Sequence, residues 1–283
     1  MTPVIQDNKT LQEWRETARF WTKHSDTIRT MFAPLTEALI EDARIRQGQT
    51  VLDVAGGAGE PSLTIAEKVG SKGSVTCTDA VAEMVAAAEI EAQRRGLTNL
   101  TFRQCVADSL PFESNSFDAV VSRLGVMFFP DPLAALREML RVAKPGGSLS
   151  LAVWHKNELN PFTHIATDVM SRYIESPPAD PDAPNAFRFA ELGKLASILK
   201  LAGAGDVSER VFRFQIEAPI SPSEYWDMRS ETSDMLREKL AKLSANQVLR
   251  VKQEVREAVG EFFPNGQMNF PAQMIIVTGK KPE

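Results

Sequence analysis

Residues 51–62 read VLDVAGGAGEPS: a short apolar run, a group of small residues, and then the start of a helical pattern. This order is typical of a buried strand that ends in a tight turn before a helix. Glycines at such a turn keep Cβ atoms away from a ligand lying across it, so Gly57 and Gly59 are expected to leave room for one. The segment therefore predicts an α/β fold with a nucleotide-like ligand at this turn.

Two kinds of ligand fit such a turn. A dinucleotide places its pyrophosphate at the helix N-terminus, whereas S-adenosylmethionine presents an ammonium group. Asp53 lies beside the turn, where its carboxylate would repel a pyrophosphate but attract an ammonium directly or through water. The dinucleotide fingerprint also lacks its third glycine, because Ser62 occupies that position. The pattern therefore favours S-adenosylmethionine, with S-adenosylhomocysteine as the product.

The segment from Val51 to Ser62 resembles the first motif of class I S-adenosylmethionine-dependent methyltransferases. The broad group that it resembles includes the ubiquinone and menaquinone biosynthesis methyltransferases and many small-molecule enzymes. Ala55 departs from the commonest form of the motif, in which glycine is usual. The resemblance implies S-adenosylmethionine as cofactor, and the binding residues expected from the motif and from the strand ends are Asp53, Ala55, Gly56, Gly57, Gly59, Asp79, Ala80, Met84, Ala107, Asp108, Ser109, Ser122 and Arg123.

Three acids follow three consecutive predicted strands, and the carboxyl ends of such strands border the ligand crevice of an open α/β sheet. Asp53 follows the first strand, and Asp79, 20 positions beyond Gly59, follows the second. A carboxylate at that spacing accepts hydrogen bonds from ribose hydroxyls, which suits NAD equally well. The resemblance implies that Asp108 receives the adenine amino group. It also implies that Met84 packs on the adenine, although the helical spacing of Met84 fits a core residue as well.

Strand and helix patterns alternate from residue 49 onwards, which predicts an α/β, Rossmann-like, seven-stranded and mostly parallel sheet with helices on both faces. The expected strands are 50–54, 74–78, 100–106, 117–122, 148–154, 207–217 and 273–278. We expect a core at 49–218 and 270–283, an N-terminal helical cap at 1–48, and a helical insert at 219–269 before the last strand. Ser221 and Ser244 begin capping boxes in this insert, which is expected to cover the substrate or to form a homodimer contact.

Several residues are expected near the acceptor. The candidates for substrate contact are Trp21, His24, Met127, Trp154 and Trp226, and an insert that covers the pocket would also turn Tyr225, Met228 and Arg229 toward it. Met127 belongs to an apolar stretch that either roofs the methyl-transfer site or is plain core. His155 is the candidate catalytic residue, because an imidazole takes a proton from a phenol or an enol near neutral pH. The alternative for His155 is a solvated loop histidine.

The composition of the chain indicates which classes of binding partner are disfavoured. The 283-residue chain has a net charge of −5 and no concentrated run of Lys and Arg, which disfavours a nucleic-acid substrate. No apolar run near the N-terminus resembles a signal peptide and none is long enough to cross a membrane, so a cytoplasmic protein without a membrane span is expected. Cys77 and Cys105 fall in predicted strands, and with only three histidines no metal site is expected. The segment 177–184, dense in Pro and Asp, is predicted to be a loop.

Together these patterns predict methyl transfer from S-adenosylmethionine to an oxygen or carbon of a small-molecule acceptor, aromatic or quinone-like. Two alternatives stay open. One is an NAD(P)-dependent oxidoreductase on the same kind of sheet, and the other is a non-catalytic protein that binds S-adenosylmethionine.

Overall fold

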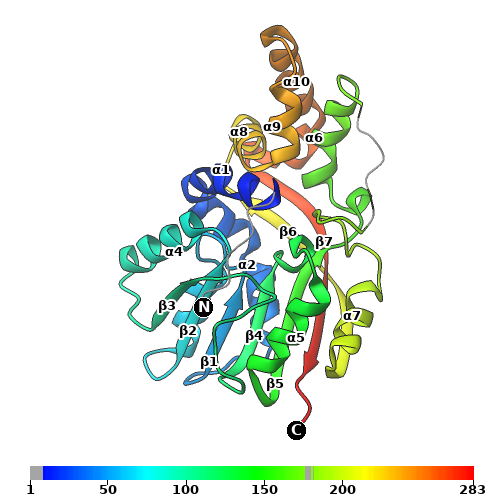
Figure 1. Cartoon of the computed structure of the whole chain (residues 1–283). Helices are drawn as coiled ribbons and strands as arrows, with labels where there is room; N and C mark the ends of the chain where they lie inside the picture. The colour runs from blue at the N-terminus through cyan, green and yellow to red at the C-terminus, as the bar shows by residue number, and fades with distance from the viewer. Residues whose placement is uncertain (1–8, 176–179, 181) are drawn as a thin grey trace.

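The computed structural model describes residues 9–175, 180 and 182–283, so most of the predicted loop 177–184 lies outside the described residues. One seven-stranded sheet organises the molecule, in the order β3-β2-β1-β4-β5-β7-β6 (Figure 1). Its strands are β1 (Thr50–Val54), β2 (Ser74–Asp79), β3 (Leu100–Gln104), β4 (Phe117–Arg123), β5 (Ala143–Trp154), β6 (Gly205–Ala218) and β7 (Met268–Lys280). The pairs from β3 to β5 are parallel, and β7 runs antiparallel to both β5 and β6. The predicted α/β fold class is confirmed.

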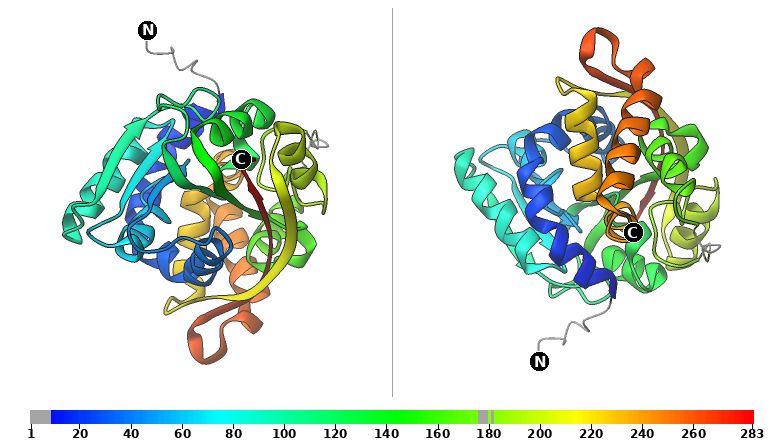
Figure 2. Two further views of the ribbon diagram at one scale, coloured as in Figure 1. Left: turned by 90° about the horizontal axis from the view of Figure 1, so that it is seen from below. Right: turned by 90° about the horizontal axis from the view of Figure 1, so that it is seen from above.

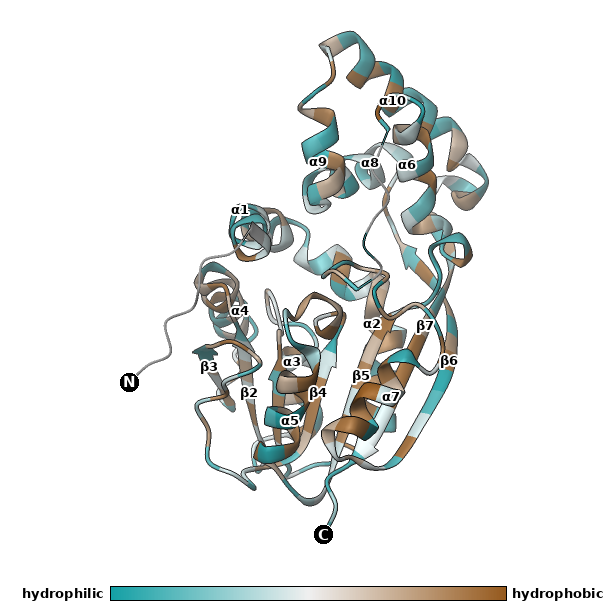
Figure 3. Cartoon of the chain, turned by 45° about the vertical axis from the view of Figure 1, so that its right-hand side comes forward, coloured by the Kyte–Doolittle hydropathy of each residue, from teal (hydrophilic) through white to brown (hydrophobic). Residues whose placement is uncertain are grey.

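Helices cover both faces of the sheet because the central strands are apolar on both sides. Val51, Leu52 and Val54 of β1 are all at most 2% exposed. The covering helices are α2 (Ser25–Asp42), α3 (Ser62–Val69), α4 (Ala82–Arg94), α5 (Pro132–Val142) and α7 (Lys194–Ala202), with α2 on one face of β5 and α5 with α7 on the other (Figure 3). No helix within the residues that the structure describes combines the length and the apolar character needed to span a bilayer.

A second helical layer lies above the carboxyl ends of the strands (Figure 1). It consists of α1 (Lys9–Lys23), α6 (Pro161–Ser171), α8 (Pro222–Thr232), α9 (Asp234–Leu240) and α10 (Ala245–Ala258). Seen from above, α1 runs between α4 on one side and α8 on the other (Figure 2). Both expected capping boxes are present, at Ser221 with Glu224 and at Ser244 with Gln247.

The proposed division into cap, core and insert stays a prediction, but two helices pack elsewhere than it implied. The helix α2 falls in the predicted cap 1–48, yet it packs on β4, β5 and β6 with Met31, Leu35 and Leu39 fully buried. The helix α6 falls in the predicted core 49–218, yet it contacts α9 and α10 of the predicted insert. An amphipathic pattern shows that a helix is covered on one side, but it does not show by what.

Some element boundaries also differ from the predictions. The helix after the glycine turn begins at Ser62 rather than near Gly59, because the turn itself is longer. The third strand ends at Gln104 instead of 106, and Cys105 follows it. The fifth strand begins at Ala143, since residues on both sides of the turn at 144–147 pair with neighbouring strands. Gly146 in that turn has φ 71°, as a type II turn requires at its third position.

Candidate functional site

Asp53 is the best-enclosed charged group of the site. It is fully buried at the end of β1, and its Oδ2 accepts hydrogen bonds from the Ser62 backbone N–H at 3.1 Å and from the Ser62 hydroxyl at 2.6 Å. Its Oδ1 is enclosed and has no hydrogen-bond partner among the described residues. Burial raises the pKa of Asp53 to about 7, against the lowering effect of Ser62 and of the Arg123 charge. An unpartnered carboxylate oxygen is a site for a cationic group or a water.

The glycines of the turn differ in what surrounds the position that a Cβ would occupy. Gly57 has φ 55°, and a Cβ built on it would meet no atom within 4 Å, so the space expected there for a ligand exists. A Cβ on Gly59 would lie 2.7 Å from the Leu63 side chain, so the space predicted at Gly59 is taken by packing within the start of α3. A Cβ on Gly56 would lie 2.7 Å from Asp53 Oδ2, so this glycine makes room for the buried carboxylate.

Ala55 adopts φ 60°, which is the left-handed region that favours glycine. This conformation explains why the related motif usually has glycine here. The Ala55 Cβ lies against Gly125, because a Cβ added to that glycine would be only 2.7 Å from it. The turn therefore keeps its shape with alanine at this position, at the cost of a strained backbone.

Asp79, at the end of β2, holds the turn from the other side. Its Oδ2 accepts a hydrogen bond from the Gly57 N–H at 3.0 Å, and its Oδ1 accepts one from the Val81 N–H at 2.9 Å. Burial raises the pKa of Asp79 to about 6 despite these hydrogen bonds. Each oxygen keeps a lone pair, so binding of ribose hydroxyls stays a prediction that the geometry permits. Ala80 follows directly, and its carbonyl accepts from the Gln104 amide at 3.0 Å.

The third acid lies at the same edge of the sheet. Cys105 donates its backbone N–H to the Asp79 carbonyl at 3.0 Å, which holds the start of the turn after β3 beside the end of β2. Asp108 is exposed in that turn, between the partly buried Ala107 and Ser109. The structure thus gathers Asp53, Asp79 and Asp108 at the ends of three neighbouring strands, as predicted from the sequence.

Two further predicted residues form the carboxyl end of β4. The Ser122 hydroxyl is buried and has no hydrogen-bond partner among the described residues. Arg123 donates from Nη1 to the Thr36 hydroxyl at 2.7 Å and from Nη2 to the Glu60 carbonyl at 3.2 Å. Burial lowers the pKa of Arg123, while the charges of Glu60 and Asp53 act in the opposite direction. The Arg123 side chain thereby ties α2 to the segment that follows the glycine turn.

The helix α1 covers this edge of the sheet on the side of α4. Met84 packs in a small cluster with Ala18 of α1 and Val81, and Trp21 and Ala58 lie against the same cluster. Trp21, expected near the acceptor, therefore lies over the glycine turn and α4. Its indole nitrogen is enclosed without a hydrogen-bond partner among the described residues.

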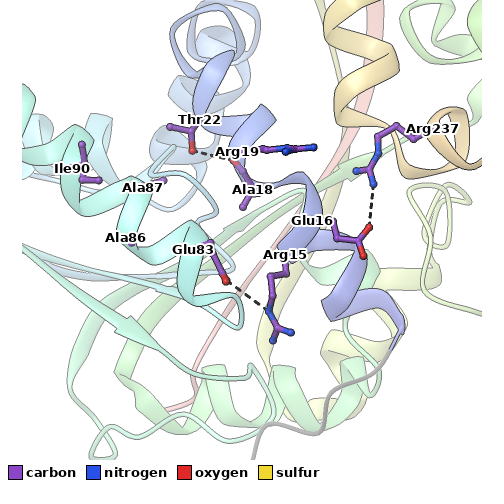
Figure 4. Close-up of a pocket in the computed structure, with 10 residues that line it drawn as sticks. All are labelled: Arg15, Glu16, Ala18, Arg19, Thr22, Glu83, Ala86, Ala87, Ile90 and Arg237. Carbon is purple, nitrogen blue, oxygen red and sulfur yellow. Dashed lines mark hydrogen bonds and ion pairs between the residues drawn. The ribbon is translucent and has the colours of Figure 1, made fainter.

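Ion pairs join the middle and the C-terminal end of α1 to neighbouring helices. Glu231 of α8 lies 2.8 Å from Lys23 Nζ and 2.6 Å from His24 Nε2. Arg15 lies 3.9 Å from Glu83 of α4, and Glu16 lies 3.3 Å from Arg237 of α9. A groove of about 640 Å³ lies along this seam between α1, α4 and α9 (Figure 4). His24 thus contacts the insert through Glu231, a partner 207 positions away that no local pattern indicates.

An aromatic series extends from α2 through the end of β5 to the insert. Trp154, at the end of β5, lies 6.0 Å between ring centroids from Phe32 of α2 and stacks on Phe162 of α6 at 6.3 Å. Phe162 in turn contacts Tyr225 of α8 at 5.6 Å. Among the other predicted acceptor residues, Met127 and Trp226 are both nearly fully buried. Phe32 was not predicted as a site residue, because its spacing in the sequence fits a helix face that covers the sheet.

His155 lies next to Trp154, and its side chain is almost buried. Its Nδ1 is 2.7 Å from the Ala190 carbonyl oxygen, an acceptor only, so Nδ1 carries the proton and Nε2 of the neutral ring carries the lone pair. This contact ties the end of β5 to the segment before α7. Across the described residues, no group of three or more His, Cys, Asp and Glu side chains is placed to hold a metal ion.

Comparison with known proteins relates part of the sequence to a methyltransferase family. The sequence profile of the ubiE/COQ5 methyltransferase family matches residues 35–174. An uncharacterised protein of Mycobacterium tuberculosis is 41% identical over 124 residues, which are 44% of each chain. The ubiquinone/menaquinone biosynthesis C-methyltransferase UbiE of Cellvibrio japonicus is 42% identical over 123 residues, 42% of this chain and 49% of that protein. The chain spans about half the length of the curated relatives it matches.

A solved structure extends the comparison to the fold. The YcgJ protein of Bacillus subtilis is 23% identical, covers 88% of this chain and 98% of its own, and superposes with a TM-score of 0.57. Residues 35–174 of this chain are thus related to the ubiE/COQ5 methyltransferase family, and the resemblance to class I S-adenosylmethionine-dependent methyltransferases that the sequence predicted is confirmed.

Proposed function

We propose that this protein transfers a methyl group from S-adenosylmethionine to an oxygen or carbon of a small-molecule acceptor that is aromatic or quinone-like. The observation that carries the proposal is the edge where β1 and β2 end: an unpartnered buried oxygen of Asp53, open space at Gly57, and Asp79 beside them. The relationship of residues 35–174 to a methyltransferase family supports the reaction class. The name of the Cellvibrio relative, a quinone-biosynthesis C-methyltransferase, supports the acceptor class.

The residues present fit the proposed donor better than a dinucleotide. Asp53 and Asp79 place two ionisable carboxyls at the turn, and a negative site there repels a pyrophosphate. The same charge favours an ammonium and a sulfonium. We assign Asp53 to the amino-acid end of the donor, Asp79 to the ribose and Asp108 to the adenine.

The acceptor is proposed to lie between Trp154 and the helices above it. Trp154, Phe162 and Phe32 form a series of rings at the carboxyl ends of β4 and β5. Such rings bury a planar aromatic ligand with little loss of side-chain entropy. The homodimer contact through the insert and the cytoplasmic location stay predictions.

Methyl transfer from a sulfonium requires few catalytic groups from the protein. When bound, S-adenosylmethionine supplies an electrophilic methyl group on a sulfonium. The side chains then need to align the acceptor and exclude water, which α1 and the aromatic series are positioned to do. His155 keeps its proton on Nδ1 at the Ala190 carbonyl, so its Nε2 is the candidate to take a proton from an acceptor hydroxyl.

Titration calorimetry tests the donor directly. We expect micromolar binding of S-adenosylhomocysteine and no binding of NADH. Asp79→Ala is expected to weaken S-adenosylhomocysteine binding by about tenfold or more, because a charged hydrogen-bond partner is lost. NADH binding without S-adenosylhomocysteine binding would make the protein a dinucleotide enzyme. Donor binding without turnover on phenols and quinols would instead support a non-catalytic binding protein.

A further inference from the structure

Arg229 of α8 is a cation without a carboxylate partner among the described residues. Its guanidinium lies 4.9 Å from the centroid of the Phe162 ring, and its Nε is enclosed with no hydrogen-bond partner among the described residues. Burial lowers the pKa of Arg229, and the phenol of Tyr225 is the ionisable group that acts against this effect, through its charge and through a hydrogen bond between the two side chains. A phenol is neutral at physiological pH, and burial raises the pKa of Tyr225 further, to about 12. Arg229 therefore keeps an uncompensated positive charge.

The two other arginines whose pKa burial lowers differ from Arg229 in this respect. Arg123 interacts with the carboxylates of Glu60 and Asp53, and it donates hydrogen bonds through both Nη atoms. Arg188 interacts with the carboxylates of Asp182, Asp131 and Asp180, and it donates to the Phe129 carbonyl. Neither lacks negative charge in its surroundings. Of these three arginines, Arg229 in the insert is the one without a nearby carboxylate among the described residues.

The surroundings of Arg229 do not offset its charge. Phe162 belongs to the first turn of α6, and the N-terminal end of a helix is itself positive. A cation–π contact recovers only part of the hydration that an enclosed guanidinium loses. An anion placed between the guanidinium and the start of α6 would compensate both positive charges.

The position of Arg229 relates it to the proposed acceptor site. Phe162 stacks on Trp154, which contacts Phe32, and Arg123 lies 5.7 Å from the Phe32 ring. Arg229 therefore lies at the end of the aromatic series that faces the insert, while Arg123 lies at the end that faces the donor turn. A planar acceptor lying along the rings would bring its far end to Arg229.

We propose that Arg229 binds an anionic group, a carboxylate or a phosphate, on an aromatic acceptor. This inference rests on the proposed function, because it names the class of acceptor for that same site. A guanidinium binds either anion through two parallel hydrogen bonds. The acceptor is then an aromatic acid or phosphate rather than a neutral phenol or quinol.

Fluorescence titration of the wild-type protein, with S-adenosylhomocysteine present and absent, tests the inference. The probes are benzoate, phenyl phosphate and the neutral benzamide. We expect at least one anion to bind about tenfold or more tightly than benzamide, as charged hydrogen bonds require. In Arg229→Met this ratio should fall to about one. Arg188→Met is the matched control and should keep the wild-type ratio. Benzoate against phenyl phosphate shows which anion is preferred.

Stability gives an independent readout. Removing this partly buried charge, which has no counterion among the described residues, should leave the urea midpoint of unliganded Arg229→Met equal to or above that of the wild type, whereas removing a structural cation would lower it. Arg229→Lys keeps the charge but not the planar fork, and should bind the preferred anion with intermediate affinity.

Equal binding of anions and benzamide, no binding of either anion at millimolar concentration, or a wild-type ratio in Arg229→Met would each overturn the inference. Calorimetry with S-adenosylhomocysteine separates this failure from failure of the proposed function. Donor binding without anion preference leaves methyl transfer standing. Anion preference without donor binding leaves the Arg229 site standing and removes methyl transfer.

Discussion

Donor affinity is expected to rise steeply with pH, because two carboxyls at the glycine turn have raised pKa values. Asp79 has a pKa of about 6, so about a tenth of it is ionised at pH 5 and about nine-tenths at pH 7. If the donor binds the ionised form, this group alone strengthens binding about tenfold over that range. Asp53, with a pKa of about 7, adds about fiftyfold.

The slope of the affinity against pH separates the two groups. Calorimetric titration with S-adenosylhomocysteine should show affinity that rises about fiftyfold between pH 5 and 6 and about tenfold between pH 6 and 7. Asp79→Asn removes one ionisable group and should leave only the shallower dependence, set by Asp53. Circular dichroism at each pH verifies that the protein stays folded. An affinity that changes less than about threefold between pH 5 and 7 would refute the assignment of these carboxyls to the donor.

Three further predictions concern single contacts. Asp53→Asn should raise the free energy of unfolding at pH 8 by about 1–3 kcal/mol in urea titrations, since ionising the buried carboxyl costs about 4 kcal/mol and a mispaired amide about 1–3. Because the folded pKa is raised from 3.8 to about 7, the cost accumulates between these two pH values and is about 2 kcal/mol at pH 5, which the mispaired amide offsets, so the gain should vanish there; an equal gain at both pH values would contradict this. Gly125→Ala should destabilise by about 1–3 kcal/mol through its clash with Ala55, and less in an Ala55→Gly background; additive effects in the double-mutant cycle would exclude the clash. Glu231→Gln should speed hydrogen exchange of residues 9–23 while changing global stability by less than about 1 kcal/mol, and unchanged exchange would show that the ion pairs do not hold α1.

The sequence predicted most of the sheet because its signals are local. The strand at 50–54, the glycine turn and the two capping boxes each depend on residues within a few positions of one another. The gathering of three acids at one edge also followed from the sequence, because parallel strands place their carboxyl ends together. These features needed no knowledge of long-range packing.

The remaining features depend on contacts between distant residues. Gly59 carries the pattern of a ligand-facing glycine, but Leu63 packs where its Cβ would be. The amphipathic face of α2 fits a lid as well as a sheet cover, and only the packing on β5 and β6 decides between them. The carboxylate that pairs with His24 is 207 positions away, and Arg229 stands out only because no carboxylate among the described residues pairs with it. Neither the presence nor the absence of such a partner can be inferred from a helical pattern.

The position of α1 has a consequence for the order of events. The helix packs on the donor side through Ala18 and is tied to the insert through Lys23 and Glu231. A ligand beneath it enters and leaves only when both attachments give way, so donor and acceptor exchange share one opening step. Exposed ion pairs of this kind weaken as ionic strength rises. Product release should therefore be faster in high salt, and turnover limited by that opening should increase with salt before binding of the substrates weakens.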